Sequence, residues 1–359
     1  MLLVLALGAA IWWAGKALGV PRQARFLLLG LLYVVVLMVQ VALPRGHGLR
    51  EATGGSPALW LILGGFVALT IAYRAVLARL RARAGGGVTD AGSAASPARP
   101  GEGPMGEAEL ERYARHIMLR EIGGPGQQAL RQARVLVVGA GGLGAPALQY
   151  LGAAGVGTLG VIDDDTVENA NLQRQVIHRD ADIGMPKVFS AQAAVQAQNP
   201  FVTVRPYRRR LDGEVAEALF ADYDVILDGS DNFATRELVN RAAVAAGKPL
   251  VWGALSQWEG QVSVFDPAEG APCYACVFPE RPAPGLAPSC AEAGVLGPLP
   301  GVIGAMMAVE GVKLVTGAGA PLRGRLALYD ALWGETRQVA VKPRPGCAVC
   351  GAGAGRGPA

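Results

Sequence analysis

Three long apolar segments open the chain, at about 2–20, 26–44 and 57–75. Each is close to the roughly 20 apolar residues that a helix needs to cross the hydrocarbon core of a membrane. Their few charges, such as Lys16, lie near segment ends, where a long basic side chain can reach the interface. The pattern predicts a membrane region over 1–78 with three transmembrane helices. A signal peptide is a weaker interpretation of the first segment, which lacks a basic start and a cleavage site.

Positive charge is distributed unevenly around these segments. Arginines follow the first and third segments, at Arg22, Arg25, Arg74, Arg79, Arg81 and Arg83. The loop after the second segment carries less net charge, with Arg45 and Arg50 against Glu51. By the positive-inside rule, the N-terminus is expected outside and everything after residue 74 in the cytoplasm. We therefore expect a multi-pass protein of a bacterial inner membrane.

The apolar pattern stops at residue 79, and the stretch 79–106 is rich in Gly, Ala, Ser and Pro. Such a composition is typical of a flexible linker. The last residues, 352–359, have a similar composition and are expected to be a disordered tail. Between them, 107–351 is expected to form one domain with its own core.

Within 107–351, short apolar runs alternate with helical stretches. The first helical pattern places Leu110, Tyr113 and Ile117 on one face. Five strand-like runs follow, at 135–139, 159–163, 202–207, 225–228 and 250–253, and three later ones at 261–265, 325–330 and 336–341. The alternation predicts an α/β fold with a doubly wound, Rossmann-like, mainly parallel sheet. The three later runs are expected to add antiparallel strands at its C-terminal end.

Charge and composition narrow the function. The net charge of +4 is too small to indicate a nucleic-acid surface. Only three histidines are present, which leaves little material for a Ser/His/Asp or histidine–metal site. Four of the five cysteines form two C-x-x-C pairs, an arrangement that favours a metal site in a reducing compartment over a disulfide framework.

The first candidate site is a glycine-rich turn between a predicted strand and a helix. Its glycines are Gly139, Gly141, Gly142 and Gly144. This spacing allows a tight turn and close approach of backbone amides to phosphate at a helix N-terminus. Asp163 ends the next predicted strand, where a carboxylate can bind ribose hydroxyls. The pattern predicts an adenine nucleotide without choosing between NAD and ATP; a turn required only for packing is the alternative.

Cations further along the chain favour a triphosphate. The run Asn171-Leu-Gln173-Arg174-Gln175 follows, and Lys187 opens a predicted helix. A triphosphate carries more charge than the pyrophosphate of a dinucleotide and usually recruits Arg, Lys and Mg²⁺. Either cation alone could be a solvated surface charge.

A polar turn ends the predicted strand 225–228. Ligands bind outside the carboxyl ends of strands in such sheets. Asp231 is expected to hold Mg²⁺, and Asn232 to contact the nucleotide. Asp228 could equally be a turn cap.

The two C-x-x-C pairs are Cys273 with Cys276 and Cys347 with Cys350. Two such knuckles can complete a tetrahedral thiolate site although they are far apart in sequence. We expect a structural Zn²⁺ site without catalysis. Two unrelated reduced pairs are the alternative.

These motifs occur in the order found in the MoeB/ThiF family of adenylyltransferases, which the chain resembles over about 110–351. Further matches are RYARHIMLR at 112–120 and GMPK at 184–187. The resemblance implies a homodimer that binds Mg-ATP and adenylates the C-terminal glycine of a ubiquitin-like sulfur carrier ending in Gly-Gly. Molybdenum-cofactor biosynthesis is the expected pathway, and the thiamine pathway is the alternative. The membrane region is a departure, because the usual members are soluble.

The resemblance also implies residue roles. It marks Gly142 and Asp163 as nucleotide contacts, Asn171, Arg174 and Lys187 as ribose and phosphate ligands, Asp231 as the magnesium site, and Arg115 as an arginine finger donated across the dimer. It places a cysteine at Cys290, in a Pro-rich loop. This thiol is either a nucleophile that attacks the acyl adenylate or a loop cysteine without a role.

Two other functions fit parts of the pattern. An NAD-dependent oxidoreductase would need a general acid near the end of the sheet, and the sequence offers no candidate. An inactive membrane scaffold would show gaps among the phosphate-binding residues, and none is missing.

Overall fold

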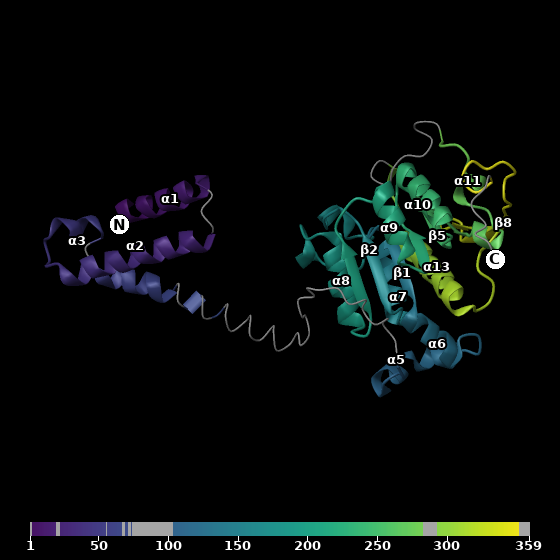
Figure 1. Cartoon of the computed structure of the whole chain (residues 1–359), viewed down its shortest axis with the longest axis horizontal. Coiled ribbons are helices and arrows are strands. Elements are labelled where there is room, and N and C mark those ends of the chain that lie inside the picture. Colours follow the sequence, from purple (N-terminus) through teal and green to yellow (C-terminus); the bar gives the residue numbers. More distant parts are fainter. Residues whose placement is uncertain are drawn as a thin grey trace. The chain divides into compact units, whose positions relative to one another are not determined.

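A computed structural model describes residues 2–18, 22–54, 56–66, 69–70, 73, 103–282 and 293–351. The chain divides into two compact units, Met1–Ala95 and Ser96–Ala359 (Figure 1). The first contains the apolar segments and the second contains every motif expected to carry chemistry. We call them the N-terminal unit and the catalytic unit.

The N-terminal unit is helical. Its helices are α1 (Leu2–Ala17), α2 (Arg22–Ala42), the short α3 (Gly48–Ala52) and a helix over Pro57–Phe66. They meet around a small apolar core of Val4, Val36 and Trp60. The Trp60 indole donates a hydrogen bond to the Thr53 carbonyl at 2.9 Å, and the Tyr33 hydroxyl donates one to the Trp60 carbonyl at 2.7 Å.

The prediction of three membrane-spanning helices is only partly confirmed. Among the described residues of this unit, one helical stretch, Ala24–Ala42, is both long and apolar enough to cross a membrane. Helix α1 has 16 residues, or about 24 Å at 1.5 Å per residue, which is short of a hydrocarbon core of about 30 Å. The third predicted span, 57–75, is described as a helix only over Pro57–Phe66, and several of its later residues lie outside the described ones.

A second long apolar helix, α13 (Pro298–Thr316), lies in the catalytic unit. Leu299, Ile303 and Met307 on this helix are buried against the sheet and α7. Its apolar character therefore reflects a core position.

One eight-stranded sheet organises the catalytic unit, in the order β3-β2-β1-β4-β5-β6-β7-β8. The strands are β1 (Arg134–Val138), β2 (Thr158–Ile162), β3 (Thr203–Tyr207), β4 (Val225–Asp228), β5 (Leu250–Leu255), β6 (Glu259–Phe265), β7 (Arg325–Asp330) and β8 (Glu335–Ala340). The first five are parallel, and β6, β7 and β8 are antiparallel. The predicted mixed sheet is confirmed.

Helices cover both faces of the parallel strands because alternate residues of each strand point to opposite faces. One face packs on α6 (Gly123–Gln132), α7 (Gly144–Ala154), α8 (Lys187–Gln198) and α13; the other packs on α9 (Gly213–Ala221), α10 (Phe233–Ala245) and the short α11 (Tyr274–Val277). Three short 3₁₀ helices occupy Asn169–Asn171, Asp180–Asp182 and Pro267–Glu269. Strands β1, β2 and β4 are almost completely buried, which explains their continuous apolar runs.

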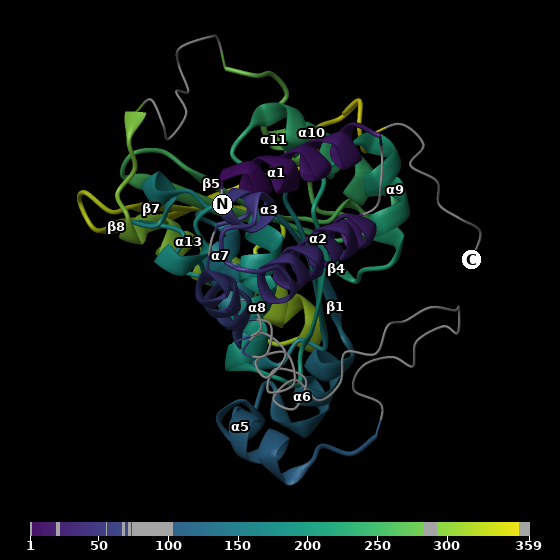
Figure 2. The ribbon, with the colours of Figure 1, turned by 90° about the vertical axis from the view of Figure 1, so that its left-hand side faces the viewer.

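The sheet order fixes where a ligand can bind. Connections leave β1 in one direction and β4 in the other, so a crevice opens outside their carboxyl ends. The predicted helix of residues 107–118 is present as α5 (Glu107–Ile117) and lies with α6 at the lower end of the catalytic unit in Figure 1 and Figure 2. Its Tyr113 packs against Gly155, which caps the C-terminus of α7, so α5 lies at the edge of the sheet opposite that crevice.

Candidate functional site

The glycine turn after β1 needs glycine at both ends. Gly139 has φ +91°, and a Cβ there would lie 3.2 Å from the Gly229 carbonyl oxygen after β4. A Cβ on Gly144, the first residue of α7, would overlap the Gly139 carbonyl oxygen. The turn is therefore tight, and its backbone is accessible to a ligand at the α7 N-terminus.

Asp163 reaches across from the end of β2 to this turn. One carboxylate oxygen accepts a hydrogen bond from the Ala140 N–H at 2.7 Å, and the other accepts one from the Asp165 N–H at 2.8 Å. Burial raises the pKa of the Asp163 carboxyl above its ordinary value, against the opposing effects of the Lys187 ammonium and these two donors. The glycine turn therefore positions the Asp163 carboxylate next to the predicted nucleotide site.

Lys187 is the first residue of α8 and is buried, with a relative exposure of 4%. Its ammonium forms an ion pair with the Asp165 carboxylate at 2.7 Å. Asp165 is largely exposed, so this ion pair faces the solvent side, and the buried Asp163 carboxylate also interacts electrostatically with the Lys187 ammonium. One carboxylate oxygen from each of Asp163, Asp164 and Asp165 lies within 4.8 Å of the other two, a grouping that was not predicted to bind a metal.

The predicted phosphate-binding run lies over the glycine turn. A Cβ on Gly142 would lie 3.9 Å from Cδ of Arg174, which places this arginine directly beside the turn. Arg174 donates a hydrogen bond to the Asn171 side-chain oxygen at 3.2 Å. Gln173 packs against Gly297, the residue before α13. Residues 139–144, 163, 171–174 and 187 therefore converge at one edge of the sheet.

The polar residues of the turn after β4 have two kinds of environment. Asp228 and Asn232 accept capping hydrogen bonds, and Asp231 is exposed to solvent. Asp228 is fully buried and accepts a hydrogen bond from the Ser230 N–H at 2.9 Å, so it caps the turn. Burial raises the pKa of its carboxyl. Asn232 is the N-cap of α10, and its side-chain oxygen accepts a hydrogen bond from the Thr235 N–H at 2.9 Å. Only Asp231 of this group is exposed without a capping role in the described structure.

One other predicted catalytic residue, Arg115, lies away from this edge. Arg115 is exposed on α5, at the opposite edge of the sheet. Helix α7 separates the two edges by its 11 residues, or about 16 Å. Cys290 lies outside the described residues.

The sequence reading missed two buried polar residues that follow Arg174. Gln175 is 4% exposed, and its side-chain nitrogen would lie 3.6 Å from a Cβ on Gly141. His178 is 6% exposed, and its Nε2 lies 2.9 Å from the Ala140 carbonyl oxygen. The only sequence indication of a role for these two residues was their position within or just after Asn171–Gln175. The backbone groups near them, at Ala140 and Gly141, lie much earlier in the chain.

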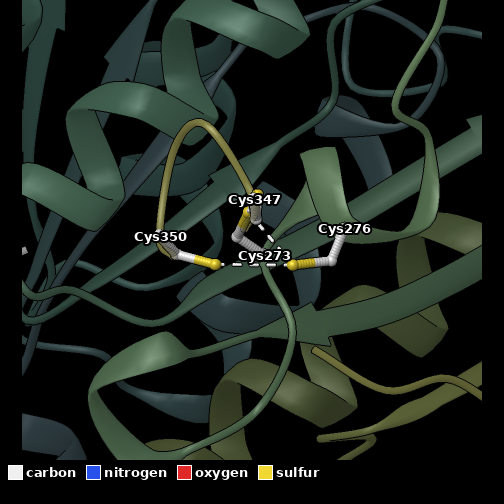
Figure 3. Close-up of side chains that lie close together, drawn as sticks. All are labelled: Cys273, Cys276, Cys347 and Cys350. Carbon is white, nitrogen blue, oxygen red and sulfur yellow. Dashed lines mark hydrogen bonds between the residues drawn. The ribbon is translucent and has the colours of Figure 1, made fainter. Parts of the chain in front are cut away.

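The four predicted metal ligands come together at a second place in the catalytic unit (Figure 3). Sulfur–sulfur distances are 3.8 Å for Cys273–Cys276, 3.7 Å for Cys273–Cys347 and 3.4 Å for Cys276–Cys350. A tetrahedral zinc with Zn–S bonds of about 2.3 Å needs sulfur atoms roughly 3.8 Å apart, so the set fits this ion. Burial raises the pKa of the Cys273 thiol to about 11, and a bound dication would reverse that preference.

Sequence comparison identifies the family of the catalytic unit. The ThiF family model matches residues 113–349, which include the nucleotide turn and three of the four clustered cysteines. The chain belongs to the ThiF family. This confirms the resemblance drawn from its motifs.

Curated relatives of this ThiF-family chain are named for adenylyl transfer or activation. The sulfur carrier protein adenylyltransferase of Thermus thermophilus is 53% identical over 247 residues, covering 68% of this chain and 91% of the relative. The SAMP-activating enzyme E1 of Haloferax volcanii is 50% identical over 245 residues, covering 68% and 90%. The molybdopterin-synthase adenylyltransferase of Escherichia coli is 45% identical over 250 residues, covering 69% and 98%.

Solved structures support the fold. A crystal structure of E. coli MccB with ATP superimposes with a TM-score of 0.59 at 22% identity, covering 68% of this chain and 75% of that one. A structure of PaaA superimposes with a TM-score of 0.58 at 23% identity, covering 75% and 81%.

Proposed function

We propose that the chain uses ATP to adenylate the C-terminal glycine of a small ubiquitin-like sulfur-carrier protein, with release of pyrophosphate. The observation that supports this most is the convergence of the glycine turn, Asp163, Arg174 and Lys187 at one edge of the sheet. The names of the ThiF-family relatives add the type of reaction and of substrate. Molybdenum-cofactor biosynthesis is the proposed pathway, in line with the E. coli relative that this chain matches over 98% of its length.

Different residues would bind the ribose and the phosphates of ATP. Asp163 is oriented by the Ala140 N–H and has its other lone pairs free for ribose hydroxyls. The phosphates follow the glycine turn, where the N-terminus of α7 favours negative charge. Arg174 lies over Gly142, and Lys187 approaches from α8, so both are placed to neutralise the triphosphate. Asn171 orients the Arg174 guanidinium by accepting its hydrogen bond.

The reaction needs positioning and charge neutralisation more than proton transfer. The carrier's terminal carboxylate is ionised at pH 7 and attacks the α-phosphorus directly. The bond to the β-phosphate oxygen breaks, and pyrophosphate leaves with the displaced electron pair. Asp231, exposed after β4, would hold Mg²⁺, which when bound supplies further neutralisation of the phosphates. Preorganised cations at such sites contribute about 3–4 kcal/mol each to transition-state stabilisation.

A homodimer would complete the site. Arg115 is exposed on α5, at the far edge of the sheet from the glycine turn of its own chain. An arginine finger in this position can serve only a nucleotide held by another copy. The proposed role of Arg115 is therefore donation to the partner's phosphates, where it would stabilise charge that develops in the transition state.

Cys290 is the proposed nucleophile of a following step. Its thiolate would attack the carbonyl carbon of the acyl adenylate, AMP would leave, and a thioester with the carrier would form. Adenylation precedes this step and uses none of its chemistry. Cys290→Ala is therefore expected to keep pyrophosphate exchange and to lose any covalent adduct with the carrier.

The N-terminal unit is the proposed membrane anchor. Apolar side chains point outward on α2, where Leu27 and Val41 are each 75% exposed. Gln40 on the same helix is fully buried, and its side-chain nitrogen donates to the Arg50 carbonyl and to the Thr53 hydroxyl. Apolar side chains on the outside suit lipid, and the two hydrogen bonds of the Gln40 side-chain nitrogen keep that group paired inside the unit. The proposed topology places the catalytic unit in the cytoplasm, joined by the linker 79–106.

Pyrophosphate exchange tests the proposed function. Labelled pyrophosphate should enter ATP only when the chain and a carrier ending in Gly-Gly are both present. Exchange with the molybdopterin-synthase small subunit is the expected result, and exchange with a thiamine-pathway carrier alone would move the enzyme to that pathway. No exchange with either carrier, under conditions in which ATP binds, would contradict the proposal.

A further inference from the structure

Two successive peptide groups of the glycine turn are held by two different side chains. The peptide between Gly139 and Ala140 presents its N–H to the Asp163 carboxylate at 2.7 Å. The next peptide, between Ala140 and Gly141, presents its carbonyl oxygen to His178 Nε2 at 2.9 Å. Ala140 itself is fully buried, so both hydrogen bonds lie inside the protein.

The hydrogen-bond partners of His178 define its proton. A carbonyl oxygen can only accept, so Nε2 carries the hydrogen. Burial lowers the pKa of the His178 imidazole below its ordinary value, and the Lys187 ammonium acts in the same direction, against Asp163, Asp182 and the Ala140 carbonyl. A neutral ring with hydrogen on Nε2 leaves Nδ1 as an acceptor.

Ser190 on α8 supports the other side of the ring. Its hydroxyl lies 2.8 Å from His178 Nδ1 and 2.7 Å from the Asp182 carboxylate. The single hydroxyl proton can serve either acceptor. The imidazole is therefore fixed between the glycine turn and α8, the helix that begins with Lys187.

Fixing the Ala140 carbonyl also fixes the following amide. In a trans peptide the C=O and N–H bonds point in opposite directions, so the Gly141 N–H points away from His178. Among the residues that the structure describes, no group accepts a hydrogen bond from this N–H. It lies at the entrance of α7, beside Gly142 and Arg174, where an anion is favoured.

We propose that His178 is a positioning residue for the nucleotide, which aims the Gly141 N–H at the phosphates by holding the carbonyl of the same peptide. This inference rests on the proposed binding of ATP at the glycine turn. It assigns Asp163 and His178 separate tasks, the first toward the ribose and the second toward the phosphates. Loss of His178 should consequently weaken binding of phosphates and spare binding of adenosine.

Two substitutions separate this role from simple packing. In His178→Gln, the side-chain nitrogen can occupy the place of Nε2 and still donate to the Ala140 carbonyl, while the contact with Ser190 is lost. In His178→Asn, the side-chain oxygen can replace Nδ1 as an acceptor and keep the contact with Ser190, while the Ala140 carbonyl loses its donor. Ser190→Ala is the matched control, because it removes support behind the ring and leaves the bond to Ala140.

The experiment measures the dissociation constants of ATP and adenosine by calorimetry on the full chain in detergent, without a carrier. His178→Asn should weaken ATP binding by about tenfold or more, as expected for a buried carbonyl left without its donor, and should leave adenosine binding unchanged. His178→Gln and Ser190→Ala should bind ATP within about threefold of the wild type, which is less than 1 kcal/mol.

Three results would overturn the inference: equal weakening of ATP and adenosine, equal weakening by Asn and Gln, or wild-type ATP binding by the Asn variant. If the Asn variant does not fold, the Gln variant decides, because a tenfold loss of ATP affinity there contradicts the assignment. Because no carrier is present, failure of carrier adenylation would leave this test intact. Failure of the wild type to bind ATP would refute the proposed function itself.

Discussion

The carboxyl edge of the parallel strands and the four-cysteine cluster lie in the same unit but expose their functional atoms very differently. At the carboxyl edge, Asp231 is exposed, and Arg174 is only partly buried beside a turn whose amides are accessible. In the cysteine cluster, Cys273 and Cys347 are fully buried and all four sulfur atoms face one another. One place is open to a ligand, and the other is a closed set of four thiols that fits a metal ion.

The difference follows from how each place is built. The carboxyl edge uses loops that leave one rigid sheet, so its side chains are positioned while its donors remain free. The cysteine cluster joins two segments that are separated by 74 residues and have little other regular structure around the second pair. A metal bound there would substitute for a missing core. The first region should therefore control chemistry and the second stability.

Removing one cation at the carboxyl edge should have the largest effect on catalysis. Lys187→Met keeps the apolar stem and deletes the charge beside Asp165. Pyrophosphate exchange should fall by about 10²–10³, as for other preorganised charges at reaction centres. The melting temperature should change little, because the lost ion pair has a largely exposed partner. Lys342→Met, on the exposed C-terminal stretch, is the matched control, and exchange near the wild-type rate in the Lys187 variant would contradict the assignment.

Breaking the cysteine cluster should produce the reverse pattern. Cys347→Ser should lower bound zinc from about one ion per chain and reduce thermal stability, because structural zinc contributes about 10–16 kcal/mol to binding in small peptides. Exchange per folded molecule should remain measurable. Cys290→Ser removes the fifth cysteine and should retain the metal. Full zinc content in a variant without either C-x-x-C pair would refute the site.

Mixed dimers test whether a residue of a second chain completes the site at the carboxyl edge. Arg115→Ala and Lys187→Ala should each be almost inactive alone. Mixing them should restore up to about a quarter of the wild-type exchange, because one composite site can regain both groups when subunits pair at random. Absence of recovery, with subunit exchange verified, would show that Arg115 does not act across the interface.

The smallest expected effect is the pH dependence of thermal stability that comes from the buried imidazole of His178. Because burial lowers the pKa of His178, the unfolded chain binds more protons than the folded one below the unfolded value of 6.5. The His178 contribution to the free energy of unfolding is thus complete above 6.5 and declines as the pH falls toward the folded pKa. Asp163, Asp182 and Lys187 face the ring and are common to both proteins. The melting temperature of His178→Gln should fall less than that of the wild type between pH 7.5 and 5.5, and equal falls would contradict a lowered pKa.

Sequence patterns predicted the features that depend on nearby residues better than the features that depend on contacts between distant parts of the chain. The strands β1 and β4 lie within one residue of their apolar runs, because burial on both faces leaves a continuous pattern. The cysteine cluster was also predictable, because two C-x-x-C knuckles supply the four thiolates that a tetrahedral site needs. By contrast, His178 acts on a backbone carbonyl 38 residues away, and no side-chain pattern encodes such a partner. Asn232 caps α10 through its side-chain oxygen, and its predicted contact with the nucleotide stays a prediction. A short polar residue after a strand suits both tasks, so its type alone could not decide between them.

The apolar N-terminal segments show a further limit. Their composition predicted three membrane spans, yet helix length depends on where capping and packing end each helix. Gln40 and Thr53 form hydrogen bonds inside the N-terminal unit, and α1 ends at Ala17. Composition therefore identified the segments, and among the described residues of this unit one of them, Ala24–Ala42, is long enough to span.

The mass of the carrier's C-terminus tests the central claim most directly. The full chain is incubated with ATP, Mg²⁺ and a carrier ending in Gly-Gly, quenched in acid, and the carrier is examined by intact and fragment mass spectrometry. The account predicts one AMP on the terminal glycine, absent when that glycine is deleted and strongly reduced with the Lys187→Met enzyme. An unmodified carrier despite bound ATP, or AMP attached to any other residue, would contradict the account.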